Sequence, residues 1–469
     1  MSSLNELSIT EASKKLATGE ITSVQLVEAC LAEIEKRNSS LNAFLEVFSD
    51  AKEQAQKADE RRAAGESHPL LGIPLAIKDN ILIEGRKASA ASKMLQNYIA
   101  TYDATVIKKL KEAGAVFLGR TNMDEFALGG STENSAYGVT KNPHDEKRVA
   151  GGTSGGSAAA VASGMALGAL GSDTGGSVRN PASFCGVVGL KPTYGAVSRS
   201  GLIAAVSSFD QIGPITKTVE DAELIFNTIR GQDPLDSTSI GMENIKLQIS
   251  NNKNIGVPRK LLGKGVEPEV LAQFEHSLEK LKAQGCEVVD IALPALDYAL
   301  SAYYIINFAE VSTNLSRFDG VRYGLSLKGE SLFDDYATTR GEGFGAEARR
   351  RIMLGTYVLS AGYYDAYYGK ATAARVQLRK EFEDAFKSVD FIATPTMPYP
   401  AWKVGEKSDP LAAYLADIFT VTANLTGNPA ISIPMGTVER EGKQLPVGLQ
   451  LTAAHGDEAA LFAAGKLLY

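Results

Sequence analysis

Residues 171–186 read "GSDTGGSVRNPASFCG", and they follow a second run of glycine and serine, "GGTSGGS", at residues 151–157. Both runs are flanked by apolar segments typical of helix and strand, so a solvated linker is disfavoured. Neither run contains G-x-x-x-x-G-K-[ST], so a phosphate-binding loop is disfavoured as well. The remaining interpretation is a set of small residues around a reactive hydroxyl, which needs a group to take its proton.

The proton acceptor is expected to be a lysine rather than a histidine. Residues 152–156 match the nucleophile elbow G-x-S-x-G, but a match is easily produced in so glycine-rich a stretch. An elbow serine at Ser154 would need a histidine, and only His455, in an expected turn, suits that role. The four histidines are His68, His144, His276 and His455.

Lys78 is the candidate base because it ends the apolar strand predicted in "LGIPLAIKDN", residues 71–80. A lysine can act as a base near neutral pH when burial lowers its pKa from about 10.4 to about 7. A shift of roughly three pKa units disfavours the charged form by about 4 kcal/mol, so the side chain must be enclosed. On the strand pattern alone, an exposed lysine at the strand end is an equally good interpretation.

Hydrophobic periodicity predicts an α/β fold. A helix is expected in "TSVQLVEACLAEIEKRN" behind a capping box of Thr22 and Gln25, and residues 1–65 should be largely helical. After the strand that ends at Lys78, a helix capped by Asp103 is expected in residues 103–114, and a strand in "AVFLG". Helix then strand recur over residues 266–293, which indicates a largely parallel or mixed sheet.

The remaining segments extend this pattern. The run "SAAAVASGMALGALG", residues 157–171, is expected to be a buried helix. Residues 300–385 should be helical and could cover a site. Further buried strands are predicted in "DFIATPTMP", "AISIPMG" and "VGLQLTAA".

Composition restricts the class of protein. The chain has 469 residues, 44% of them hydrophobic and 22% charged, which is ordinary for a globular protein of one large domain or two closely joined ones. A net charge of −7 disfavours independent binding of a nucleic-acid backbone. Three widely spaced cysteines suggest a reducing, cytoplasmic setting, and the sequence has neither a signal-peptide pattern nor a long apolar run, so no membrane association is expected.

Three motifs together resemble the amidase signature family. They are "GIPLAIKDN", "GGTSGGSAAAVA" and "GSDTGGSVRNPASFCGVVGLKPTYG", they occur in the family's order, and the similarity runs from about residue 7 to the C-terminus. The resemblance implies a central mixed β-sheet surrounded by helices. It also implies a single domain over residues 1–469, with a helical part at 1–65, a catalytic core at 70–240 and a helical, cap-like region at 300–385.

The resemblance implies a catalytic triad in which Ser177 is the nucleophile and Lys78 the base. Thr153 would pass the proton between them, and the peptide bond before it would be cis. Serine is common at this position in the family, and the neighbouring Ser154 is the alternative proton bridge. The added methyl group of a threonine stiffens the side chain. The oxyanion hole would be formed by backbone N–H groups around Ser177, at Thr174, Gly175 and Gly176.

Three further segments resemble one branch of the family, the glutamine-hydrolysing subunits of tRNA-dependent amidotransferases. They are "TNMDEFALGGSTENSAYG", "LSRFDGVRYG" and "RRRIMLGTYVLSAGYYDAYY". This similarity places Arg351 on the α-carboxylate of glutamine, Asp417 on its ammonium group and Tyr303 beside them, with Arg350 as the alternative to Arg351. Periodicity alone would make both Arg351 and Asp417 helix-surface charges.

The same similarity implies partners. Ammonia released from glutamine would pass to a B subunit, which amidates ATP-activated Glu-tRNA(Gln) or Asp-tRNA(Asn), while a small C subunit braces the pair. The partner would bind the tRNA, ATP and Mg²⁺, so no cofactor or metal is expected in this chain. The alternatives are a free-standing amidase on small or aryl amides, a non-catalytic scaffold, and a Ser-Lys hydrolase using the S-x-x-K of Ser277 and Lys280.

Overall fold

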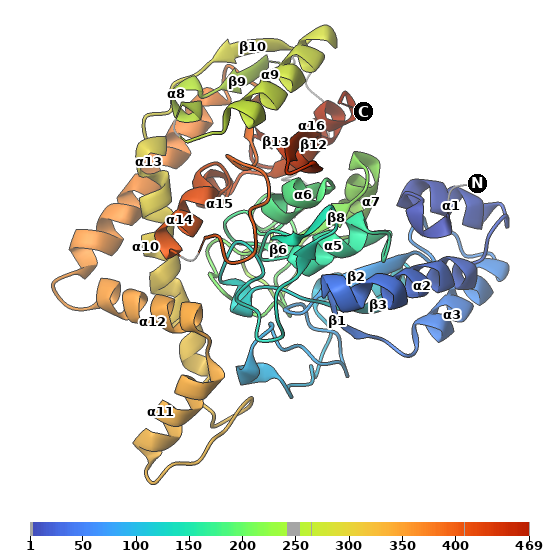
Figure 1. The fold of residues 1–469 in the computed structure, drawn as a ribbon, viewed down its shortest axis with the longest axis horizontal. Helices are drawn as coiled ribbons and strands as arrows, with labels where there is room; N and C mark the ends of the chain where they lie inside the picture. Colours follow the sequence, from blue (N-terminus) through green and yellow to red (C-terminus); the bar gives the residue numbers. More distant parts are fainter. Residues whose placement is uncertain (1–2, 242–253, 264, 408, 469) are drawn as a thin grey trace.

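A single mixed β-sheet runs through the protein (Figure 1). The computed structural model describes residues 3–241, 254–263, 265–407 and 409–468. Within these ranges, eleven strands are ordered β1-β3-β2-β6-β8-β7-β12-β13-β11-β9-β10. They are β1 (Phe44–Val47), β2 (Pro74–Lys78), β3 (Val116–Thr121), β6 (Gly168–Asp173), β7 (Val188–Lys191), β8 (Gln211–Thr216), β9 (Asn254–Val257), β10 (Glu287–Asp290), β11 (Phe391–Pro395), β12 (Ala430–Arg440) and β13 (Lys443–Ala453). A separate hairpin is formed by β4 (Lys141–Asn142) and β5 (Asp145–Val149).

Helices surround this sheet, as the amidase signature resemblance implies (Figure 1). They are α1 (Ile9–Ala17), α2 (Ser23–Leu41), α3 (Ala51–Ala63), α4 (Thr105–Glu112), α5 (Gly155–Ala162), α6 (Arg179–Cys185), α7 (Val219–Ile229), α8 (Arg259–Leu262), α9 (Pro268–Ala283), α10 (Leu296–Asn314), α11 (Leu332–Gly343), α12 (Ala346–Leu359), α13 (Lys370–Ala385), α14 (Pro410–Tyr414), α15 (Val421–Thr426) and α16 (Glu458–Lys466). None of the described helices is long and apolar enough to cross a lipid bilayer.

The three strands that place the site are parallel neighbours. Strand β2 lies between β3 and β6 and pairs with both in the parallel sense. Every residue of the three strands is buried. Because parallel strands end at the same edge of a sheet, β2 and β6 bring Lys78 and Asp173 to one edge, where α/β proteins commonly bind ligands.

Most of the predicted elements are confirmed. Helix α2 begins behind Thr22, whose hydroxyl accepts the Gln25 N–H while the Gln25 side chain accepts the Thr22 N–H. The strand predicted to end at Lys78 does so. The region 300–385 contains helices α10 to α13, and they line one side of the protein in Figure 1.

Two local predictions are wrong. Asp103 does not cap α4, because the N-cap is Ala104 and the Asp103 carboxylate instead accepts hydrogen bonds from Glu84 N and Lys111 Nζ. The run 157–171 is not one helix, because α5 ends at Ala162 and β6 begins six residues later, at Gly168. Gly164, which has a φ of +73°, makes the turn between them.

Candidate active site

Lys78 is completely buried, and four oxygen atoms surround its amine. Its Nζ lies 2.7 Å from Thr153 Oγ1 and 2.8 Å from Ser154 Oγ. It also lies 2.9 Å from the hydroxyl and 3.1 Å from the backbone carbonyl of Ser172. The side chain of Lys78 therefore lies inside the protein, and the alternative of an exposed lysine at the end of the strand is excluded.

Burial lowers the pKa of Lys78 to about 7, although carboxylates of Asp124, Asp173 and Asp210 oppose the shift. Burial away from water disfavours the charged form of the Lys78 amine, and the four oxygen atoms around Nζ belong to neutral groups that do not offset this effect. A substantial fraction of the amine is then neutral at pH 7, as a general base requires.

Thr153 and Ser154 approach Lys78 from the turn that precedes α5. The Gly152–Thr153 peptide bond is cis, as the resemblance implies. Ser154 Oγ also lies 3.3 Å from the carbonyl oxygen of Ser172, and its N–H donates to the carbonyl of Ser177 at 3.1 Å. Within the described residues no hydrogen bond joins Thr153 Oγ1 to Ser177 Oγ, so the proton path is assembled only on its lysine side.

Ser177 lies in the turn between β6 and α6, and a buried ion pair fixes that turn. The Arg179 guanidinium contacts both carboxylate oxygens of Asp173, through Nε at 3.0 Å and Nη2 at 2.9 Å. Asp173 in turn accepts the N–H groups of Gly176 and Val178, at 2.8 and 3.1 Å. Arg179 and Asp173 have no exposed surface, so the nucleophile is presented by a rigid, enclosed support.

The predicted oxyanion hole is only partly free to bind an anion. The Gly176 N–H is already used by Asp173, whereas in the described residues the N–H groups of Thr174, Gly175 and Ser177 have no acceptor. A Cβ at Gly175 would overlap the Tyr303 hydroxyl. The glycine therefore allows the tyrosine to pack against the backbone beside the nucleophile.

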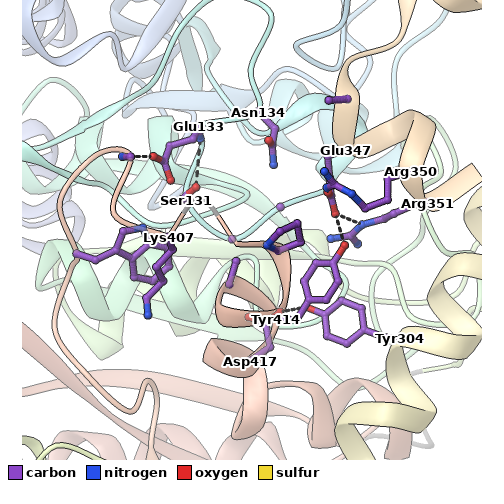
Figure 2. Close-up of a pocket in the computed structure, with 17 residues that line it drawn as sticks. Ser131, Glu133, Asn134, Tyr304, Glu347, Arg350, Arg351, Lys407, Tyr414 and Asp417 are labelled. Atoms are coloured by element: carbon purple, nitrogen blue, oxygen red, sulfur yellow. Dashed lines mark hydrogen bonds and ion pairs between the residues drawn. The ribbon is translucent and has the colours of Figure 1, made fainter. Parts of the chain in front are cut away.

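Ser177 lines a narrow pocket together with Tyr303, Tyr304, Arg351 and Asp417. The pocket adjoins a larger cavity of about 240 Å³, shown in Figure 2, and the two have Tyr304, Arg351 and Asp417 in common. The structure thus brings the three predicted substrate residues and the predicted nucleophile to one place.

Arg351, rather than Arg350, is the arginine beside the nucleophile. The Arg351 side chain is 4% exposed and the Arg350 side chain 41% exposed. Arg351 Nε donates to Glu347 at 2.7 Å and Nη1 donates to Asn307 at 3.0 Å, whereas Nη2 has no hydrogen-bond partner among the described residues and can bind a ligand. Asn307 also donates to the Tyr303 hydroxyl at 3.3 Å, which links Tyr303 to the same network.

Asp417 lies in a short 3₁₀ helix, Leu415–Ile418, and faces the pocket. Burial raises its pKa to about 7, against the hydrogen bond that Tyr304 donates to it at 2.6 Å. The Tyr304 ring stacks on Tyr414, whose hydroxyl donates to Glu347 at 2.7 Å. A cationic ligand beside Asp417 would favour its ionised form.

Sequence reasoning missed Tyr304, Glu347 and Asn307, which hold the two charged groups. Helical spacing could have indicated two of them, because Asn307 follows Tyr303 by one helical turn and Glu347 precedes Arg351 by the same interval. The alternative S-x-x-K motif of Ser277 and Lys280 lies in α9, where the Ser277 hydroxyl donates to the backbone carbonyl of Gln273 in the same helix.

The chain matches known proteins over nearly its whole length. The family model "Amidase" matches residues 25–462. The A subunit of the glutamyl-tRNA(Gln) amidotransferase of Roseiflexus castenholzii is 51% identical over 99% of this chain and 96% of its own, and that of Desulfatibacillum aliphaticivorans is 50% identical over 98% and 96%. The crystal structure of the same subunit from Thermotoga maritima is 42% identical and superimposes with a TM-score of 0.79, over 99% of this chain and 93% of that one. A peptide amidase from Stenotrophomonas maltophilia, 28% identical over 99% and 96%, gives 0.81.

Proposed function

The chain belongs to the amidase family, and we propose that it is the glutamine-hydrolysing subunit of a tRNA-dependent amidotransferase. The observation that carries this proposal is the pair Arg351 and Asp417 in the pocket of Ser177. Free glutamine carries an α-carboxylate and an α-ammonium group beside the amide that reacts, so its site must offer one cation and one anion. The names of the relatives support the same assignment.

The first chemical step forms an ester on the enzyme. Ser177 Oγ attacks the side-chain amide carbon of glutamine, while its proton passes through the Thr153 hydroxyl to the neutral amine of Lys78. The carbonyl oxygen becomes negative and is stabilised by the backbone N–H groups of Thr174, Gly175 and Ser177. Removing one such N–H donor typically costs about 3 kcal/mol of transition-state stabilisation.

The intermediate then collapses and the carbon–nitrogen bond breaks. Lys78 returns its proton through Thr153 to the leaving nitrogen, which departs as ammonia and leaves a γ-glutamyl ester on Ser177. Water attacks this ester in the reverse manner, with Lys78 again accepting a proton. Glutamate is released and the hydroxyl of Ser177 is restored.

The ammonia is consumed on partner subunits. We propose that a B subunit, braced by a small C subunit, binds ATP, Mg²⁺ and the tRNA and amidates Glu-tRNA(Gln), with Asp-tRNA(Asn) as a second candidate substrate. The net charge of −7 supports this division, because the chain itself is poorly suited to bind a phosphate backbone.

The test compares two nitrogen sources in the assembled amidotransferase. The Ser177→Ala complex should lose tRNA amidation driven by glutamine and keep amidation driven by added ammonium. Ser388→Ala, which truncates an exposed serine after α13, should keep both activities. Loss of both activities in Ser177→Ala would contradict a role confined to ammonia supply.

A free-standing amidase is the second candidate, since solved amidases superimpose as closely as the amidotransferase subunit does. A small neutral amide makes no use of Arg351 and Asp417, so their presence favours glutamine. Fast hydrolysis of benzamide with glutamine ignored would establish the second candidate instead.

A further inference from the structure

The segment "TNMDEFALGG", residues 121–130, supplies no group that bonds to the substrate in the steps above, yet it holds two adjacent buried carboxyl groups, Asp124 and Glu125. Glu125 is 3% exposed. Its Oε2 accepts the backbone N–H of Gly345 at 2.8 Å, and its Oε1 accepts the hydroxyl of Ser92 at 2.5 Å. Glu125 thus ties the end of β3 to a segment 220 residues further along the chain.

Gly345 is the N-cap residue of α12, the helix that carries Arg351 and Glu347. The N–H of the N-cap residue is one of the groups that a helix leaves without an internal partner, and in a capping box it is bound by a glutamate or glutamine at the third helical position. Ala348 occupies that position in α12, so Glu125 supplies the acceptor from elsewhere in the fold. Gly345 is needed for this contact, because a Cβ there would lie 2.6 Å from Glu125 Oε2.

Aromatic packing strengthens the same junction. Phe126, the neighbour of Glu125, has its ring centroid 5.7 Å from that of Phe344, which directly precedes the N-cap of α12. The ring centroid of Phe126 also lies 4.8 Å from that of Phe318. The start of α12 is therefore held by one hydrogen bond and an apolar contact, both from the segment that follows β3.

Asp124 fixes the opposite wall of the cavity. It accepts the N–H groups of Ser131, Thr132 and Asn134, at 3.3, 2.8 and 3.0 Å. Ser131 and Asn134 line the cavity across from Arg351 in Figure 2. Two consecutive acidic residues thus hold the two walls between which a ligand would lie.

We propose that Glu125 is a positioning residue for glutamine, because it fixes α12 and so sets the place of Arg351 relative to Ser177. This inference rests on the proposed function. Glu125 does not line the pocket and touches no substrate. It acts through the N-terminus of α12, and Glu347 and Arg351 lie within the first two turns of that helix.

The test measures kcat and KM for glutamine in the full chain, and the inhibition constant of 4-aminobutanamide against glutamine. This inhibitor is glutamine without its α-carboxylate, so its binding does not depend on Arg351. Glu125→Ala should raise the KM for glutamine about fivefold, the fold-change that corresponds to a typical lost cap, with kcat within about twofold. The inhibition constant of 4-aminobutanamide should stay within about twofold.

Two further variants separate positioning from general damage. Glu125→Gln offers an oxygen to Gly345 and an N–H to Ser92, so it should restore a KM near that of the wild type. Glu342→Ala, which truncates an exposed glutamate three residues before Gly345, is the matched control and should change nothing. If Glu125→Ala does not fold, Gly345→Ala breaks the same contact from the other side and should give the same rise in KM.

An unchanged KM for glutamine in both Glu125→Ala and Gly345→Ala would overturn the proposal. Equal weakening of glutamine and 4-aminobutanamide would also overturn it, because that result indicates general damage. If the wild-type chain ignores glutamine, the proposed function itself fails, and this outcome is seen before any variant is made.

Discussion

Glutamine hydrolysis should depend on pH through Lys78, because only the neutral amine can accept the proton of the nucleophile. With a pKa of about 7, the neutral fraction is about nine-tenths at pH 8 and about one-eleventh at pH 6. The value of kcat should therefore fall about tenfold between pH 8 and pH 6, and about tenfold more at pH 5. Above pH 8 it should be nearly constant.

The size of the pKa shift of Lys78 follows from the burial of its amine. Lowering the pKa from 10.5 to about 7 corresponds to about 5 kcal/mol in favour of the neutral form. Two serines, a threonine and a backbone carbonyl supply the hydrogen bonds of Lys78 without supplying charge. An exposed lysine would have a neutral fraction of only about 1 in 3,000 at pH 7.

The assay is ammonia release by the full chain at saturating glutamine, from pH 5 to pH 10. Saturation matters because Asp417 also titrates near pH 7, and a bound ammonium group keeps it ionised. Lys78→Arg, which retains its charge throughout this range, should be inactive at every pH. A kcat that keeps rising tenfold per pH unit between pH 8 and pH 10 would refute a buried, neutral Lys78.

Five other substitutions give three separate tests. Thr153→Val should lower kcat about 10²- to 10⁴-fold, whereas Thr153→Ser should stay within a few fold; an active valine variant would exclude Thr153 as the bridge. Arg351→Ala should raise the KM for glutamine about 30-fold or more, and Asp417→Asn should weaken glutamine but not glutaramate, which has no ammonium group; equal effects of Asp417→Asn on both compounds would contradict its role. Arg179→Ala should lower the free energy of unfolding by about 3–5 kcal/mol in urea titrations, because Asp173 would remain buried and unpaired; a loss below about 1 kcal/mol would contradict that reasoning.

The order of strands and helices could be predicted from the sequence because it depends on local periodicity. Strand β2 ends at Lys78 because an apolar run stops there, and α2 begins at Thr22 because its capping box is a local pattern. Asp103 was assigned wrongly for the same reason. A local pattern does not reveal that Lys111, near the end of the helix, competes for the carboxylate.

The substrate pocket depends on contacts between segments that are far apart in the sequence, and hydrophobic periodicity does not reveal such contacts. Arg351 and Asp417 look like helix-surface charges in isolation, and only the family resemblance brought them together. Tyr304 had no such guide, because its role is to hold another side chain, and the only signal for Glu347 was its helical spacing from Arg351. Glu125 is a similar case, since its contact with Gly345 joins segments far apart in the chain.

The most direct test of the central claim is ammonia and glutamate release by the purified chain, offered glutamine and, separately, benzamide, with Ser177→Ala as the blank. Serine-dependent turnover of glutamine, with benzamide ignored, is the predicted result. Rapid turnover of benzamide with glutamine ignored would contradict the assignment of Arg351 and Asp417 to a glutamine site.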